Sequence, residues 1–374
     1  MITNTPPMGW NSWNTFGMNV TEDLIRGSAD TMVKSGLKDA GYNYIVIDDG
    51  WSEQERDENG RLVPQHEKFP HGIKPVADYV HSKGLKFGIY SCAGIRTCGD
   101  CPGSFDHEFV DAQTFAEWNV DFLKYDYCFK PETSNGEQLY RRMSMALRAS
   151  GRDILFSACN WGSEESEKWM RAAGADMYRS TGDIMDNYNS YRDITLSQID
   201  KIAYSAPSCF NDMDMLVVGM YGKGNVGVGG CNDVGYRSHF ALWCLFHSPL
   251  MIGCDIRSIS SESLKLLTNR ELITIDQDPE CRPPYVLWKS GDTYTFVRLL
   301  SGNEYAIGMF NFNADTKGTA TCMLTDAGLS VGSGFGMQLT DVFTHEVKGV
   351  YREIFRQEIQ PHGCELYRGK LVRL

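Results

Sequence analysis

The chain has 374 residues, 42% of them apolar, which is enough to build hydrophobic cores for more than one domain. A net charge of −12 and a pI near 5.2 argue against nucleic acid as a partner, because phosphates select a basic surface. No run of roughly 18 apolar residues occurs, so we expect no membrane span. The N-terminal residues lack the basic start and the apolar segment of a signal peptide, and we therefore expect a cytoplasmic protein.

Apolar runs with the period of a strand alternate with stripes that have the period of a helix, up to about residue 279. The predicted strands are 8–13, 44–47, 85–90, 120–126, 154–157, 177–179, a weak strand near 209, and 250–252. The predicted helices are one capped by Thr21, then 74–82, 112–118, 138–148, 164–173, 191–203 and 236–246. Eight strand-then-helix units in about 275 residues predict an α/β fold, a closed (β/α)8 TIM barrel.

The pattern changes after Asp278-Pro279, where short alternating strands broken by Gly, Asn and Asp replace the helices. These strands are predicted near 286–288, 294–300, 305–312, 319–324, 337–343, 350 and 358–367. No helical stripe interrupts them, which favours an antiparallel β-sandwich. We therefore divide the chain into a barrel domain, residues 1–279, and a C-terminal β-sandwich domain, residues 280–374.

One acidic residue, Asp126, stands where an apolar strand runs out into a loop. In a barrel of parallel strands the loops that follow the strands converge on one cleft, and chemistry is placed there. Lys124 points the same way as Asp126 in a strand, and its charge favours an ionised carboxylate. Taken alone, an aspartate at a strand end more often caps a turn.

Polar and aromatic residues also stand at the ends of the other predicted strands. They are Trp13, Asp48, Asp49, Tyr90, Asn160 with Trp161, Arg179 with Asp183, and Asp212 with Asp214. Each has a structural alternative: Trp13 suits a core, and Asp183 suits the N-cap of a helix. Together they predict a sugar site, because carboxylates and amides bind hydroxyls while aromatic faces cover the apolar patches of a ring. The eight histidines form no metal-binding pattern, so we expect no metal.

Twelve cysteines in a cytoplasmic chain are expected to be mostly buried, reduced thiols. Cys98 and Cys101 form a C-x-x-C pair, with Cys92 nearby, and Cys128 would complete a zinc site. A second C-x-x-C is missing, so free thiols or one disulfide are the preferred interpretation. The glycine-rich segment 222–230 has no Gly-Lys-Ser/Thr before a helix, so it is interpreted as a flexible loop near the cleft rather than a phosphate loop.

Several blocks, in order along the chain, carry a resemblance to a known family. They are Pro7-Met8-Gly9-Trp10-Asn11-Ser12-Trp13, Ile47-Asp48-Asp49-Gly50-Trp51, Lys86-Phe87-Gly88-Ile89-Tyr90, Leu123-Lys124-Tyr125-Asp126 and Asn211-Asp212-Met213-Asp214-Met215-Leu216. The blocks resemble those of glycoside hydrolase family 27, the alpha-galactosidase and alpha-N-acetylgalactosaminidase family. The resemblance covers Pro6 to about Pro279, and the expected sandwich is similar in kind to the family's second domain.

The resemblance implies a retaining glycosidase that releases terminal alpha-linked galactose and needs no cofactor. Asp126 would be the nucleophile and Asp183 the acid/base, with their carboxyl groups about 5–5.5 Å apart. In that mechanism Asp126 is ionised and Asp183 holds a proton. The implied substrate-binding residues are Trp13, Asp48, Asp49, Tyr90, Lys124, Asn160 and Arg179. Of these, Asp48 and Asp49 would bind O4 and O6 of the sugar, and Lys124 and Arg179 would bind hydroxyls and carboxylates. Trp13 and Tyr90 would form the walls of the pocket.

The sequence departs from the family pattern at Asn160, where galactosidases have a glutamate for O2 and N-acetylgalactosaminidases have small residues. Asn160 can still hydrogen-bond a 2-hydroxyl, and it is too large for an acetamido pocket. It leaves galactose and beta-L-arabinopyranose both open as the sugar. Some relatives have a disulfide at the positions of Gly50 and Met18, and this chain lacks it. Cys98 and Cys128 match a second family disulfide. We expect these two cysteines to lie close together and leave open whether they are oxidised.

Two other classes of protein share part of this pattern. A sugar-binding module would retain the aromatics and could lose either acid, yet both Asp126 and Asp183 are present. A metal-dependent barrel hydrolase would lose activity in a chelator. The expected partner is a small carbohydrate, and neither the oligomeric state nor the leaving group follows from the sequence.

Overall fold

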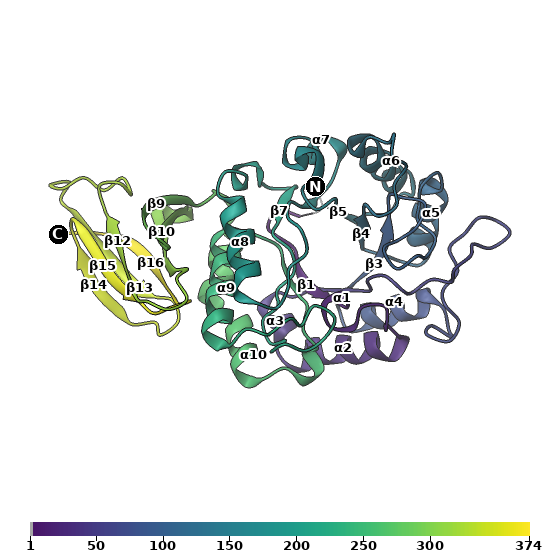
Figure 1. Cartoon of the computed structure of the whole chain (residues 1–374), viewed down its shortest axis with the longest axis horizontal. Coiled ribbons are helices and arrows are strands. Elements are labelled where there is room, and N and C mark those ends of the chain that lie inside the picture. The colour runs from purple at the N-terminus through teal and green to yellow at the C-terminus, as the bar shows by residue number, and fades with distance from the viewer. Residues whose placement is uncertain (1–2) are drawn as a thin grey trace.

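The structure, a computed structural model, describes residues 3–374 and contains two domains (Figure 1). The first is built on an eight-stranded parallel sheet in the order β7-β6-β5-β4-β3-β2-β1-β8, which confirms the predicted barrel. Its strands are β1 Met8–Asn11, β2 Tyr44–Val46, β3 Lys86–Cys92, β4 Phe122–Asp126, β5 Leu155–Cys159, β6 Met177–Arg179, β7 Phe210–Asp212 and β8 Leu250–Ile252. Their side chains are almost all buried, as expected for parallel strands covered on both faces.

The barrel closes through the segment that follows β7. Leu216 forms a parallel bridge to Ile252, with its amide donating to the Met251 carbonyl at 2.7 Å and its own carbonyl accepting from Gly253 at 2.9 Å. β7 itself has only three residues, which explains why its pattern in the sequence is weak. The closure places the ends of all eight strands around one cleft.

Helices α1 to α11 cover the barrel. They are α1 Trp13–Phe16, α2 Glu22–Lys34, α3 Leu37–Ala40, α4 Ile73–Ser82, α5 Glu108–Glu117, α6 Gly136–Ala149, α7 Met170–Ala173, α8 Tyr188–Gln198, α9 Asp233–Leu245, α10 Ser261–Leu267 and α11 Arg270–Asp276. The Thr21 side chain accepts from the Leu24 amide and so caps α2 as predicted. No helix among the described residues is long and apolar enough to cross a membrane.

The single helix predicted at 164–173 is wrong. A 3-10 turn, Ser163–Lys168, precedes the short α7, and Glu164 and Glu165 have left-handed φ values of 59° and 52°. The Glu164 carboxylate accepts from the Tyr127 hydroxyl at 2.5 Å and from the Gly136 amide at 3.0 Å. Because these bonds hold Glu164 at the N-terminus of α6, its backbone leaves the helical conformation.

The C-terminal domain contains a six-stranded antiparallel sheet, in the order β14-β13-β16-β11-β10-β9, and a β12-β15 pair. The strands are β9 Tyr285–Ser290, β10 Thr293–Leu300, β11 Glu304–Asn311, β12 Gly318–Met323, β13 Phe335–Asp341, β14 Val347–Tyr351, β15 Ile354–Ile359 and β16 Cys364–Arg373. Buried side chains such as Val297, Cys322 and Phe355 form a core of their own. This arrangement confirms the predicted β-sandwich.

The two domains are joined by a buried arginine. Arg298, on β10, is 0% exposed and donates to the carbonyl of Ile275 at 2.8 Å and to that of Cys244 at 3.2 Å. Those carbonyls belong to α11 and α9, so the guanidinium satisfies helix groups of the barrel from the sandwich. α11 ends at Asp276 and β9 begins at Tyr285.

We expect Arg298→Met to lower the free energy of unfolding by about 3 kcal/mol, because the buried carbonyls of Ile275 and Cys244 lose a charged donor and keep long backbone bonds, from Asp278 at 3.4 Å and His247 at 3.3 Å. The matched control is Arg141→Met, which removes an exposed pair with Glu137 on α6 and should cost about 0.5 kcal/mol. Urea unfolding of both variants measures the difference. Equal losses in the two would contradict the structural role of Arg298.

Candidate active site

One cavity lies at the C-terminal ends of the barrel strands. It is lined by Trp13, Asn14, Asp48, Tyr90, Cys98, Lys124, Asp126, Trp161, Arg179, Asp183, Asp214, Met215 and Val226. Seven of the nine predicted site residues are in this lining. The other two, Asp49 and Asn160, are not among the lining residues of the described chain.

Two larger hollows lie elsewhere, around Arg152 and Asp176. They are at the N-terminal ends of the strands, beside the first residues of β3 and β5. In TIM barrels that end serves stability while chemistry is placed at the opposite end. We therefore take the smaller cavity as the candidate active site.

Asp126 is the last residue of β4, and the residue is 6% exposed to solvent. Oδ2 accepts from the Tyr90 hydroxyl at 3.0 Å, and Oδ1 accepts from the Tyr127 amide at 2.9 Å. Burial raises the pKa of Asp126 to about 6, against the opposing charge of Lys124. The carboxylate is therefore fixed in orientation and readily protonated.

Lys124 faces the cavity, as the strand period predicted, but its partner is a different acid. Its Nζ lies 2.7 Å from Asp48 Oδ2, which also accepts from Asn11 Nδ2 at 2.8 Å. Lys124 thus holds Asp48 across β3 and lowers the pKa of Asp126 only through its charge. The ion pair places an ammonium and a carboxylate side by side, a suitable arrangement for vicinal hydroxyls of a sugar.

Asp49, adjacent to Asp48, is 2% exposed, and its carboxylate accepts hydrogen bonds from backbone amides of loops. Its Oδ2 accepts from the Gly99 amide at 2.7 Å and its Oδ1 from the Gly50 amide at 2.8 Å. Burial raises the pKa of Asp49, and these amide donors work against that shift. In the free protein Asp49 therefore anchors the loop that carries Cys98.

Arg179, at the end of β6, joins two acids. Its Nη2 donates to Asp183 Oδ1 at 2.9 Å and its Nη1 lies 2.8 Å from Asp214 Oδ1. Asp214 has a left-handed φ of 81°, and its amide donates to Asp212 Oδ1 at 2.9 Å. Asp183 is not a helix cap, because α8 is capped by Asn187.

The protonation expected for Asp126 and Asp183 is reversed in the free protein. Burial acts to raise the pKa of Asp183, but the charge of Arg179 and its hydrogen bond outweigh burial and leave that pKa lowered. Burial and the charge of Asp183 raise the pKa of Asp214. Asp126, expected to be ionised, has the raised pKa instead. A proton therefore resides more readily on Asp126 than on Asp183 before substrate binds.

Asn160 lies beneath the surface rather than in the cavity wall. It is 0% exposed, its Nδ2 donates to the Ser163 carbonyl at 2.7 Å, and its Oδ1 has no hydrogen-bond partner within residues 3–374. The next residue, Trp161, has a left-handed φ of 58° and lines the cavity. The contact predicted between Asn160 and a 2-hydroxyl stays a prediction.

Six lining residues were outside the nine predicted site residues: Asn14, Cys98, Trp161, Asp214, Met215 and Val226. Asp214 had a signal, since it stands two residues after another strand-end aspartate. Val226 belongs to the glycine-rich segment, and its amide donates to the Asn14 carbonyl at 3.1 Å, which brings that loop to the cavity. Met215 carried no signal of its own.

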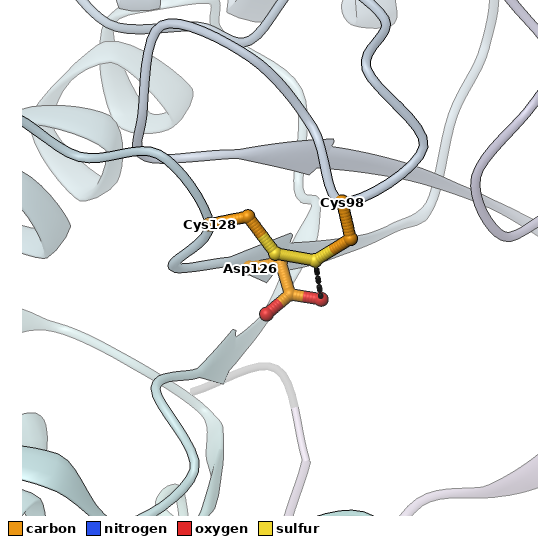
Figure 2. A group of neighbouring side chains, drawn as sticks. All are labelled: Cys98, Asp126 and Cys128. Atoms are coloured by element: carbon orange, nitrogen blue, oxygen red, sulfur yellow. Dashed lines mark hydrogen bonds between the residues drawn. A yellow bond between two sulfur atoms is a disulfide. The ribbon is translucent and has the colours of Figure 1, made fainter.

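Figure 2 shows Asp126 beside a disulfide between Cys98 and Cys128, whose Cα atoms are 5.3 Å apart. Sγ of Cys98 lies 3.7 Å from Asp126 Oδ2. The proximity of Cys98 and Cys128 expected from the sequence is confirmed. Cys101, the other member of the C-x-x-C pair, is a free and buried cysteine.

Comparison with known proteins agrees with this geometry. Residues 5–278 match the family described as Alpha galactosidase A, and residues 290–368 match the Alpha galactosidase C-terminal beta sandwich domain. The chain belongs to glycoside hydrolase family 27. As a member of this family it is a glycoside hydrolase, and both of its domains are those of the family.

Three relatives illustrate the range of the family. The alpha-galactosidase of Cyamopsis tetragonoloba is 42% identical over 98% of this chain and 86% of its own. The crystal structure of alpha-galactosidase I from Mortierella vinacea has a TM-score of 0.92 and 33% identity, covering 98% of this chain and 97% of that one. A family 27 beta-L-arabinopyranosidase variant from Geobacillus stearothermophilus, in complex with arabinose, has a TM-score of 0.88 and 26% identity, covering 98% and 97%.

Proposed function

We propose that this family 27 enzyme is an exo-acting alpha-galactosidase that releases terminal galactose from small carbohydrates with retention of configuration. The observation that supports it most is the presence of two carboxylates, Asp126 and Asp183, in one small cavity with aromatic residues. The relatives named alpha-galactosidases, at 40% identity or more over nearly the whole chain, support the same sugar.

In the proposed first step Asp126 attacks the anomeric carbon and forms a glycosyl ester. The bond to the leaving oxygen breaks, and that oxygen takes the proton of Asp183. Tyr90 and the Tyr127 amide hold the attacking carboxylate. In the second step Asp183 takes a proton from water, whose oxygen attacks the same carbon and releases Asp126.

Arg179 has a defined part in this cycle. It divides its two nitrogens between Asp183 and Asp214, so Asp183 can gain a proton while the guanidinium keeps a carboxylate partner. Asp183 has the more exposed side chain of the two, at 60% against 4% for Asp214. A bound sugar would cover Asp183 and raise its pKa by removing water.

The pH dependence of kcat/KM follows from these pKa values. Asp126 and Asp183 together must hold one proton, and the higher of their two pKa values in the free enzyme is about 6, at Asp126. As pH rises through about 6 the pair loses its last proton, so kcat/KM should fall about tenfold per pH unit above that value. A profile that stays level to pH 8 in a protein that remains folded would contradict this protonation scheme.

A second candidate sugar is beta-L-arabinopyranose, which lacks the C6 arm of galactose. One observation favours it: Asp49, expected to hold O4 and O6, is occupied by loop amides rather than placed in the cavity wall. An alpha-N-acetylgalactosaminidase would need room for an acetamido group, and the bulky Trp161 lines this cavity.

A panel of nitrophenyl glycosides tests the proposal. The purified protein is assayed on the alpha-galactoside, the beta-L-arabinopyranoside and the alpha-N-acetylgalactosaminide, and we expect the highest kcat/KM on the first. A higher value on the arabinopyranoside would replace galactose by the second sugar. Loss of activity after treatment with a chelator would support the metal-dependent alternative instead.

A further inference from the structure

The disulfide in the cavity wall has no part in the proposed mechanism. Cys98 and Cys128 come from the loops after β3 and β4, on either side of Asp126 (Figure 2). One ligand atom from each of these three side chains lies within 4.8 Å of the other two. Cys98 is exposed and lines the cavity, so a small reductant can reach its sulfur.

Reduction would turn this cluster into a set of metal ligands. A dithiol donates two electrons and two protons to the sulfur–sulfur bond, which becomes two thiols, and the dithiol leaves as a cyclic disulfide. A Zn²⁺ ion can then displace the two thiol protons and bind both sulfurs, with the Asp126 carboxylate as third ligand and water as fourth. Zinc–sulfur bonds of about 2.3 Å place the two sulfurs about 3.8 Å apart. Cα atoms 5.3 Å apart permit that separation by side-chain rotation.

The loop that carries Cys98 is held by bonds other than the disulfide. The Gly99 amide donates to Asp49 Oδ2 at 2.7 Å, and the Ile95 amide donates to the Phe129 carbonyl, next to Cys128, at 3.2 Å. The Gly103 amide closes the loop on the Ile95 carbonyl at 3.1 Å. These bonds would keep the two sulfurs neighbours after the disulfide opens.

We propose that reduction of the Cys98–Cys128 disulfide creates a zinc site with Asp126 as the third ligand, and that zinc bound there blocks glycoside hydrolysis. Two sulfur ligands select a thiophilic cation such as Zn²⁺ over Mg²⁺ or Ca²⁺. The blocking rests on the proposed role of Asp126, since it requires the metal to occupy the attacking carboxylate. Metal binding itself does not depend on that role.

Metal binding is tested on the full-length folded protein with Co²⁺ as the probe. Thiols counted after denaturation should rise from ten to twelve when the protein is first treated with a dithiol. The reduced protein should bind one Co²⁺ with a thiolate-to-cobalt charge-transfer band that Zn²⁺ removes, and the oxidised protein should show no such band. The double variant Cys98→Ser/Cys128→Ser should lose the band. Cys101→Ser, the matched control at a free cysteine in the same loop, should keep it.

Inhibition is tested on whichever glycoside the enzyme cleaves. Zinc at about ten times its dissociation constant should lower the turnover of the reduced enzyme roughly tenfold, and a chelator should restore it. The oxidised enzyme should be unaffected. A thiol count that stays at ten, a reduced protein without the band, or a band that survives in the double serine variant would overturn the zinc site. A cobalt band with full turnover in saturating zinc would leave the two sulfur ligands standing and overturn Asp126 as the third ligand, and with it the blocking. The attacking role of Asp126 is tested separately by Asp126→Asn.

Discussion

Asp126→Asn is expected to lower the turnover of an alpha-galactoside by about four orders of magnitude or more, because an amide cannot form the glycosyl ester. The side chain keeps its shape, and its Oδ1 can still accept from the Tyr127 amide, so the fold should be retained. The measurement is kcat on nitrophenyl alpha-galactoside, together with urea unfolding. A variant that keeps a tenth of the activity, about one order of magnitude lost, would contradict the nucleophile assignment.

Asp176→Asn provides a matched control for that experiment. Asp176 also lies beside a barrel strand, its Oδ2 accepts from the Phe156 amide at 2.9 Å, and burial raises its pKa to about 6. It lies at the N-terminal end of the barrel, away from the cavity. We expect turnover close to that of the unchanged enzyme, which would show that removing a half-buried acid with a raised pKa is not in itself damaging.

Asp183→Asn is expected to act in a way that depends on the leaving group. With an oligosaccharide, whose leaving oxygen needs a proton, the rate of glycosyl-enzyme formation should fall by about 10²–10⁴. With a nitrophenyl glycoside, whose leaving group departs without a proton, the same step should fall much less. Single-turnover rates on the two substrates measure this difference.

The control variant for this test is Asp193→Asn, an exposed acid on α8 whose partner is Arg192. It should change neither rate. Equal losses on both substrates in Asp183→Asn would show that the residue binds sugar rather than transferring protons.

The arrangement of the barrel was predictable because it depends on patterns that are local in sequence. Val120, Phe122 and Leu123 are apolar, and the strand that they predict is β4. The alternating residues of 294–300 likewise predict β10, with its regular antiparallel pairing. Strand ends then follow from topology, which explains why Tyr90, Asp126 and Arg179 could be expected at one end of the barrel.

Side-chain contacts between residues of different strands were harder to predict. The period of β4 places Lys124 toward the cavity, yet its nearest acid is Asp48, two strands away in the sheet, rather than Asp126 on its own strand. Asn160 follows β5 as expected, but a local bond to the Ser163 carbonyl turns its amide away. Both outcomes depend on distances between segments that are far apart in the chain.

The order of the two pKa values could not have been obtained from the residue types. It depends on how deeply Asp126 is buried and on where the Arg179 guanidinium lies, and both are tertiary quantities. The same holds for Asp214, whose ion pair with Arg179 makes it a part of the site. Its position after a strand was visible in the sequence, while its partner was not.

The most direct test of the proposed mechanism is the configuration of the first sugar released. Proton NMR of the hydrolysis of an alpha-galactoside, recorded before the free sugar mutarotates, should show alpha-galactose appearing first, because two displacements at one carbon restore its configuration. Beta-galactose as the first product would mean a single displacement by water, and Asp126 would then not be the nucleophile.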